Sequence, residues 1–266
     1  MMQMLYLQTT KQTMMDGYKM DLNILITNDD GYKSEGLMIL ANWAKKLGNV
    51  TVAAPKTEQS GKSQSIELHK PYEAKKVQMM DGIDWYYVDS TPADCVRFGF
   101  NGLKRNYDVV FSGINRGLNL GEDISYSGTV GAIFEASYMG VKALAFSTEE
   151  SSFEGAKNNL DRIYNFIVSH ELFKYNDIYN INIPLVPHDE ILVTKQGGPY
   201  FKDRFQHLGN DVYKVEGYSV YRGAQNYDED LDATLNGYIS ISPLTASSNS
   251  DTAFEKIKHL NPKKKN

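Results

Sequence analysis

The chain has 266 residues, of which 41% are hydrophobic and 23% are charged, and its formal net charge is −5. This length and composition are typical of a globular protein with a substantial core, and they exclude a fibrous or wholly disordered chain. The acidic balance argues against a protein that coats a nucleic-acid polymer, although a local site can still hold a small nucleotide.

The two ends of the chain and its one cysteine give the first expectations. Residues 1–20 are polar and rich in methionine, and we interpret them as an N-terminal extension or a non-native start rather than a signal peptide. No stretch approaches the roughly 18 continuous apolar residues of a membrane span, so we expect no membrane partner. The single Cys95 excludes an internal disulfide and fits a reducing compartment, which predicts a cytoplasmic location.

The first predicted strand ends in two adjacent carboxylates. The apolar residues 24–27 are followed by Asn28, Asp29, Asp30 and Gly31, a sequence typical of a turn. Ligands bind at the carboxyl ends of strands in open α/β sheets. Neighbouring carboxylates repel each other unless a cation lies near them, and oxygen ligands suit Mg²⁺, Mn²⁺ or Ca²⁺. The alternative is that these residues only form the turn and cap the next helix.

Strand and helix patterns alternate after this turn, which predicts βαβ units and a parallel sheet. The next helix is expected to have Ser34 as its N-cap and Gly48 as its C-cap. The later expected elements are a strand at 50–55, a strand at 84–88, a helix opened by Thr91 and Pro92, a strand at 108–111, a helix from Thr129 to Met139, a strand at 142–147 and an amphipathic helix at 160–167.

Two further loops follow predicted strands. The loop that begins at Ser112 is rich in glycine and leads into the helix expected at Thr129. Backbone amides in such a loop, together with a helix N-terminus, form a site suited to phosphate. The loop at residues 56–63 places hydroxyl groups beside Gly61, where they can reach a phosphate or a metal ion. Each loop by itself is weak evidence, because loops of this composition are common.

Together these segments resemble the SurE (survival protein E) family of metal-dependent nucleotidases. The stretches that carry the resemblance are ILITNDDGYKSEGL, VAAPKTEQSGKSQSI, STPADCV, DVVFSGINRGLNLGEDISYSGTVGAIFEA, INIP and GYISISPL. The resemblance implies an α/β fold: a Rossmann-like three-layer αβα sandwich with a mostly parallel sheet, plus a hairpin-rich C-terminal extension.

The resemblance also implies the site residues, position by position. One divalent metal ion per subunit, Mg²⁺ or Mn²⁺, is expected on Asp29, Asp30, Ser60 and Asn115. Of these, Asp29, Asp30 and Asn115 are the expected catalytic residues. The residues expected to bind substrate are Ser60, Gly61, Asn119, Ser127, Gly128 and Thr129. This all-oxygen ligand set leaves room for water and a substrate phosphate. The alternative for the Thr129 side chain is that it only caps its helix.

The implied activity is metal-dependent hydrolysis of nucleoside 5′- and 3′-monophosphates to nucleoside and phosphate, and also of short polyphosphate. One of Asp29 or Asp30 is expected to act as a base, or by a minor route as a nucleophile. The alternative function is a nucleotide-binding regulatory module without hydrolysis, which the intact ligand set disfavours. A dinucleotide oxidoreductase is disfavoured because no GxGxxG motif follows the first strand.

Three regions are expected along the chain. Residues 21–178 are predicted to form the catalytic domain, residues 179–250 a hairpin-rich region, and residues 251–266 a C-terminal helix with a basic tail. By resemblance, the middle region makes the contacts of a homodimer or tetramer, although Tyr200, Phe201 and Phe205 could equally serve local packing. We expect Glu135 to support the site loops from below through hydrogen bonds. For Asp230, a structural role is at least as strongly expected as a contact with substrate.

Overall fold

The structure, a computed structural model, describes residues 21–223 and 225–260. The predictions for residues 1–20 and for the basic tail at 262–266 therefore lie outside the described residues. No helix in these described ranges is long and apolar enough to cross a membrane.

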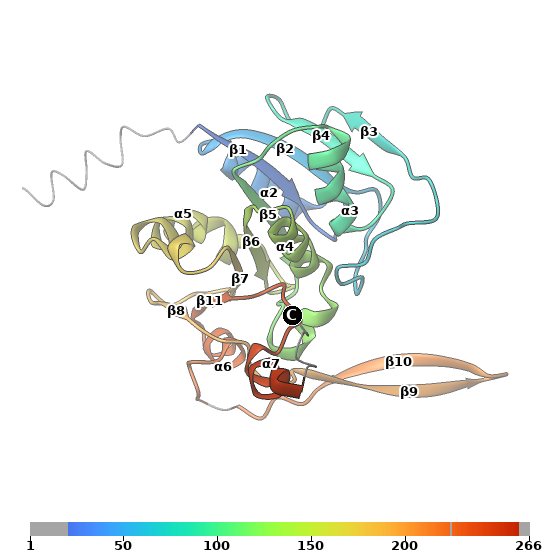
Figure 1. Ribbon diagram of the computed structural model, residues 1–266, viewed down its shortest axis with the longest axis vertical. Coiled ribbons are helices and arrows are strands. Elements are labelled where there is room, and N and C mark those ends of the chain that lie inside the picture. The colour runs from blue at the N-terminus through green and yellow to red at the C-terminus, as the bar shows by residue number, and fades with distance from the viewer. Residues whose placement is uncertain (1–20, 224, 261–266) are drawn as a thin grey trace, which may run out of the picture.

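A nine-stranded sheet runs through the centre of the molecule in the order β3-β4-β2-β1-β5-β6-β7-β11-β8 (Figure 1). Its strands are β1 (Leu22–Thr27), β2 (Gly48–Pro55), β3 (Ala74–Val77), β4 (Asp84–Val88), β5 (Val109–Arg116), β6 (Lys142–Thr148), β7 (Ile178–Ile183), β8 (Ile191–Val193) and β11 (Ile239–Pro243). Neighbouring strands are parallel except for the pairs β3–β4 and β7–β11. The mostly parallel sheet confirms the predicted fold class.

Helices cover both faces of the sheet and create two hydrophobic cores. On one face, α2 (Glu35–Ala44) and α5 (Glu154–Ser169) pack over alternate strand residues, including Ile24 and Ile26. On the other face, α3 (Pro92–Arg97) and α4 (Gly128–Tyr138) cover Leu25. Successive side chains of a strand point to opposite faces, so the apolar run of β1 contributes to both cores. The result is the predicted three-layer sandwich.

The remaining helical elements are short. They are a π-helical turn at Phe98–Gly102, 3₁₀ turns at Gly121–Tyr126, Leu172–Lys174 and Lys258–Leu260, and the helices α6 (Asp230–Leu235) and α7 (Asp251–Ile257). The helix predicted near the C-terminus is thus present as α7.

The helix caps agree with the sequence prediction in two places and differ in two others. Ser34 caps α2 and Thr91 caps α3, as predicted. Gly48 does not cap α2, however. It begins β2, where an added Cβ would lie 2.1 Å from the carbonyl oxygen of Leu22 in the neighbouring strand. The N-cap of α4 is Ser127, whose hydroxyl accepts from the amide of Val130, so this helix begins before the predicted position.

Strand β5 is longer than its apolar core suggests. It continues through Asn115 and Arg116, which pair with β6 after an irregularity in the register. The sequence prediction of a loop from Ser112 onward was wrong, because pairing with a parallel neighbour extends the strand through polar residues.

The C-terminal half both extends the sheet and leaves it. Strand β7 crosses the boundary expected between residues 178 and 179, and β8 and β11 continue the same sheet. By contrast, β9 (Phe201–Gly209) and β10 (Val212–Ser219) pair only with each other, as an antiparallel hairpin that projects from the molecule (Figure 1).

Candidate active site

A cavity of about 450 Å³ opens at the edge of the sheet where β1 and β5 end. These strands are parallel neighbours, so the residues that follow them meet at this edge. The predicted site residues that line the cavity are Asp29, Asp30, Ser60, Gly61, Asn115, Asn119 and Ser127. The structure thus brings all four predicted metal ligands to one place: Asp29 and Asp30 from the turn after β1, Ser60 from the loop after β2 and Asn115 from the end of β5.

Asp29 is buried and held from the side of α4. Its side chain accepts a hydrogen bond from the hydroxyl of Thr129 at 2.5 Å. Burial raises the pKa of Asp29, and the hydrogen bond from Thr129 opposes that effect. Gly128 allows the close approach of the helix, since a Cβ there would lie 2.9 Å from the Cβ of Asp29.

Gly128 and Thr129 therefore sit behind the cavity rather than on its lining. The Thr129 side chain is fully buried and its hydroxyl is engaged with Asp29. This position differs from the predicted contact with substrate. In this position both residues help to fix the Asp29 carboxylate: Thr129 by its hydrogen bond and Gly128 by allowing α4 to approach.

Asp30 faces the cavity more openly than Asp29 does. Its carboxylate accepts a hydrogen bond from the backbone amide of Arg116 at 3.2 Å. Burial and the neighbouring charge of Asp29 raise the pKa of Asp30 to about 6. A carboxyl group with this pKa exchanges its proton readily near neutral pH.

Ser60 and Asn115 offer neutral oxygen atoms to the same cavity. The hydroxyl of Ser60 donates to Glu58 at 2.6 Å, and this residue is exposed. The Asn115 side-chain nitrogen donates to the carbonyl of Gly117 at 2.7 Å. That bond fixes the amide so that its oxygen is the atom left to act as a ligand.

The cavity carries more negative than positive charge. Besides the two aspartates, its lining includes Glu58, Asp123 and Glu150, against the single cation Arg116. A phosphate cannot enter such a site favourably unless a cation compensates the carboxylates. No group of three or more His, Cys, Asp or Glu residues within the described ranges forms a metal cluster by itself. The available donors are two carboxylates, a hydroxyl and an amide, and this set fits a hard divalent cation.

Sequence reasoning missed Glu58, Arg116, Asp123 and Glu150. Charged residues in loops usually face solvent, so nothing in their local sequence marked them. Their only signal was position, since Glu58, Arg116 and Asp123 lie within the family stretches quoted above, whereas Glu150 lies outside them.

Two acidic residues outside the cavity support its loops. Glu135 accepts a hydrogen bond from Gln64 at 3.0 Å, as expected for a residue that holds the loops from below. Asp230 is buried and accepts from the backbone amides of Gly121 and Gly197 at 3.0 and 2.8 Å. Asp230 thereby ties the C-terminal region to the loop after β5, which agrees with a structural function.

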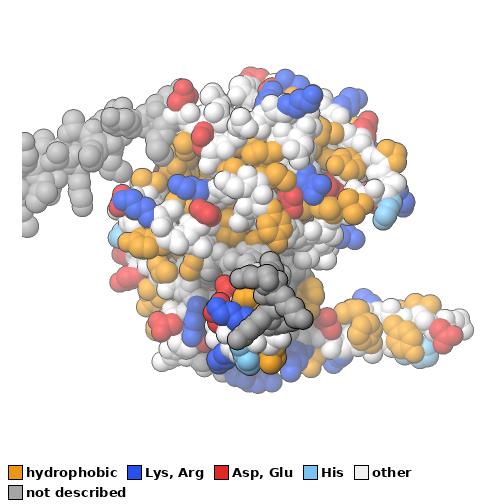
Figure 2. All heavy atoms as spheres, in the orientation of Figure 1, with side chains coloured by type: hydrophobic (Ala, Val, Ile, Leu, Met, Phe, Trp, Pro, Cys, Tyr) orange, Lys and Arg blue, Asp and Glu red, His pale blue; other side chains and the backbone are white. Residues whose placement is uncertain are grey.

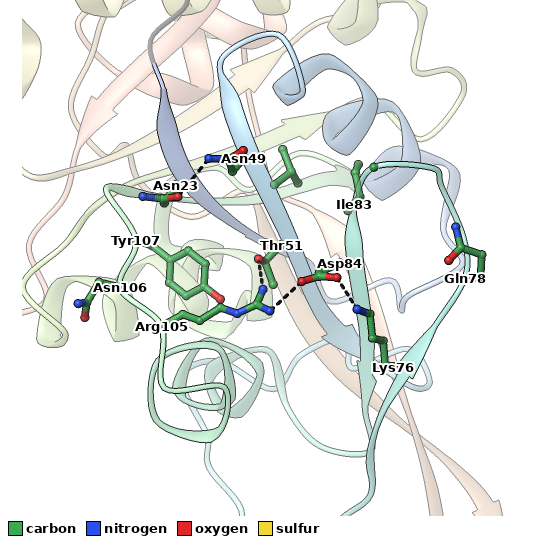
Figure 3. A pocket seen from close by; sticks show the side chains of 12 residues that line it. Asn23, Asn49, Thr51, Lys76, Gln78, Ile83, Asp84, Arg105, Asn106 and Tyr107 are labelled. Carbon is green, nitrogen blue, oxygen red and sulfur yellow. Dashed lines mark hydrogen bonds and ion pairs between the residues drawn. The ribbon is translucent and has the colours of Figure 1, made fainter.

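A second, larger cavity lies at the opposite edge of the sheet, near the amino ends of β1, β2 and β4 (Figure 3). Its volume is about 720 Å³. Its charged groups are paired with one another, since both Arg105 and Lys76 contact Asp84, and Arg105 also donates to Thr51. Ligands of open α/β folds bind at the carboxyl edge. We therefore assign the candidate active site to the smaller, acidic cavity.

Comparison with known proteins shows which family the chain belongs to. The model of the family described as survival protein SurE matches residues 24–203, a range that contains all four predicted metal ligands. A 5′-nucleotidase SurE from Petrotoga mobilis is 34% identical over 235 residues, covering 84% of this chain and 93% of that protein. A 5′-nucleotidase SurE from Clostridium botulinum is 37% identical over 240 residues, covering 84% of this chain and 92% of that protein.

The fold is shared as well. The crystal structure of the SurE protein from Aquifex aeolicus matches with a TM-score of 0.76 at 34% identity, covering 90% of this chain and 99% of that one. Sequence and structure thus agree over nearly the whole described length, and the chain belongs to the survival protein SurE family.

Proposed function

We propose that this protein is a metal-dependent phosphomonoesterase that hydrolyses nucleoside 5′-monophosphates, and 3′-monophosphates, to nucleoside and phosphate. The observation that carries the proposal is the convergence of Asp29, Asp30, Ser60 and Asn115 on one acidic cavity. Relatives named 5′-nucleotidase that align over most of the chain support the substrate class. Short polyphosphate is a further proposed substrate, because cleavage of its terminal phosphoanhydride bond uses the same metal-assisted attack of water on phosphorus.

Asp29, Asp30, Ser60 and Asn115 would hold one divalent metal ion per subunit, Mg²⁺ or Mn²⁺. When bound, such an ion supplies charge neutralisation for the phosphoryl group and acidity to a water molecule. The fit rests on the donor atoms: two carboxylates provide charge, and two neutral oxygens leave the site open to a dianionic phosphate.

The surroundings of the two aspartates separate their functions in this proposal. Asp29 is buried and committed to Thr129, so it serves as a fixed ligand. Asp30 is less buried and faces the cavity, so it is the better placed of the two carboxylates to accept a proton from the attacking water. The same group would have to be unprotonated and unhindered to act as a nucleophile, which is the minor route.

Other residues of the cavity would steady the phosphate. The N-terminus of α4 begins beside Ser127, and the partial positive charge of a helix N-terminus favours an anion there. Arg116 adds the one full positive charge of the lining. Asn119 offers an amide group from the loop that follows β5.

The proposal extends to assembly and location. The exposed hairpin of β9 and β10 carries the apolar side chains Phe201, Phe205, Leu208, Val212, Tyr213, Val215 and Tyr218 (Figure 2). So many exposed apolar side chains on one projecting hairpin support a homodimer, or a tetramer, built through it. A reducing, cytoplasmic location is supported by the lone Cys95, which is buried and unpaired.

A substrate panel tests the proposed function. Phosphate release is measured from nucleoside 5′- and 3′-monophosphates, short polyphosphate and p-nitrophenyl phosphate, each with Mg²⁺ or Mn²⁺. We expect the nucleoside monophosphates to give the highest kcat/KM. A folded protein that binds these nucleotides but releases no phosphate with either metal would instead indicate the regulatory module.

A further inference from the structure

Two asparagines of β7 are buried without any place in the mechanism above. Asn180 and Asn182 are completely inaccessible to solvent. Asparagine is depleted in strands, and a buried amide is costly unless its hydrogen bonds are satisfied. The two residues share one face of β7, because side chains alternate along a strand. The residue to which both side chains donate hydrogen bonds therefore indicates what they stabilise.

That partner is Asn119, which lines the catalytic cavity. The Asn182 side chain grips its backbone at two points: its oxygen accepts from the Asn119 amide at 2.8 Å, and its nitrogen donates to the Asn119 carbonyl at 2.8 Å. The Asn180 side-chain nitrogen donates to the same carbonyl at 2.8 Å. Both backbone groups of Asn119 are thus satisfied by side chains of one strand.

These hydrogen bonds are needed to fix the backbone of Asn119, because this residue lies outside regular secondary structure. It falls between the end of β5 at Arg116 and the 3₁₀ turn that begins at Gly121, so no strand neighbour fixes its backbone. The two β7 side chains take the place of a strand ladder. They hold the residue against the sheet rather than leaving it to move with the loop.

The side chain of Asn119 is fixed as well. Its nitrogen lies 2.8 Å from the hydroxyl of Ser147, which pairs with Asn182 in the register of β6 and β7. A hydroxyl can donate or accept, so either end of the Asn119 amide can bond to Ser147 while the other end faces the cavity. With an anion in the cavity, the NH₂ group is the end that would face it.

We propose that Asn182, assisted by Asn180, is a positioning residue that holds Asn119 in place to bind the phosphate group of the substrate. The inference rests on the proposed function, since it requires a phosphate in the cavity. Asn182 itself does not line the cavity. Its effect reaches the phosphate only through Asn119.

A double-mutant cycle tests this dependence. Asn182→Ala, Asn119→Ala and the double variant are compared with wild type in hydrolysis of adenosine 5′-monophosphate, in inhibition by inorganic phosphate and in Mn²⁺ binding. We expect Asn182→Ala to raise KM and the phosphate inhibition constant about tenfold, with kcat within about threefold and the Mn²⁺ Kd unchanged. The double variant should be no worse than Asn119→Ala alone.

The matched control is Asn176→Ala. Asn176 lies just before β7 at the opposite end of the strand, where its side chain also bonds two carbonyl groups, those of Ile178 and Leu244, at 2.6 and 2.8 Å. This variant loses comparable hydrogen bonds far from the cavity, so its KM should stay at the wild-type value. If Asn182→Ala does not fold, Asn180→Ala removes only one contact and should raise KM about threefold.

The outcomes separate the positioning claim from the proposed function. An active wild type whose KM and phosphate inhibition are unchanged by Asn182→Ala, or effects of Asn182→Ala and Asn119→Ala that multiply in the double variant, would overturn the positioning claim alone. A wild type without phosphate release would overturn the proposed function and the positioning claim with it.

Discussion

Asp29 and Asp30 are adjacent in sequence, yet their surroundings differ in a way that gives separate predictions. Thr129→Val removes the hydroxyl that donates to Asp29 and keeps the side-chain shape. A hydrogen bond to a charged group contributes about 1.5–3 kcal/mol, so we expect Mn²⁺ affinity to fall between ten- and a hundredfold. Isothermal titration calorimetry with Mn²⁺ measures this affinity in the variant and the wild type. Thr234→Val, which removes a buried hydrogen bond to Ser240 away from the site, should leave that affinity unchanged.

The pH dependence at Asp30 has a definite sign. Its pKa is raised from 3.8 to about 6, so this group stabilises the metal-free fold at low pH and loses that contribution as pH rises through about 6. Metal binding requires the deprotonated carboxylate, so the affinity for the metal ion increases over the same pH range. We therefore expect the increase in Tm caused by Mn²⁺ to be larger at pH 7 than at pH 5. An equal increase at both values, or the same pH dependence in Asp30→Asn, would contradict this.

At the scale of elements, α4 sets the position of two loops at once. Its first turn approaches Asp29 through Gly128, and its second approaches the loop that carries Ser60 through Gly131. A Cβ at Gly131 would lie 2.2 Å from the carbonyl oxygen of Ser63, so the loop would have to move. We expect Gly131→Ala to lower kcat/KM at least tenfold while the protein stays folded, as measured by kinetics and circular dichroism.

The control for this prediction is Gly198→Ala. An added Cβ at Gly198 meets no atom within 4 Å, so this variant should retain wild-type kinetics. Wild-type kcat/KM in Gly131→Ala would show that the Ser60 loop does not depend on contact with α4.

Sequence predicted the elements best where the signal was local. Ser34 and Thr91 cap helices as their sequence positions indicate, and the strand at 84–88 has the predicted bounds. It failed where a tertiary contact decides: Gly48 belongs to a strand because β1 lies against it, and β5 runs on to Arg116 because β6 pairs with it.

The same distinction applies to the site. The motif residues Asp29, Asp30, Ser60 and Asn115 meet as expected. The position of Thr129 behind Asp29 is set by how α4 packs on the turn after β1, and no local pattern encodes that packing. Of the two β7 asparagines, only Asn182 lies in a family stretch (INIP), and no local pattern marks either, because their partner lies about 60 residues earlier in the chain.

At the scale of the whole molecule, the hairpin of β9 and β10 is separable from the catalytic sheet. Its strands pair only with each other, and its apolar side chains are exposed. Replacing the paired residues Phe205 and Val215 by serine should weaken self-association at least tenfold and leave the fold intact. Light scattering coupled to size exclusion measures the mass.

Tyr175→Ser is the matched control for the hairpin, since Tyr175 is an exposed aromatic residue after α5. It should not change the mass of the particle. If the hairpin variant keeps the wild-type mass at all concentrations, the hairpin is not the assembly surface.

The central claim is that the acidic cavity is a metal-dependent site of phosphate hydrolysis. The most direct test is phosphate release from adenosine 5′-monophosphate by wild type and Asp30→Asn, with Mn²⁺ or with EDTA. We expect release by the wild type with Mn²⁺ only, and at least a thousandfold loss of kcat in Asp30→Asn. Release that persists in EDTA, or Asp30→Asn as active as wild type, would contradict the claim.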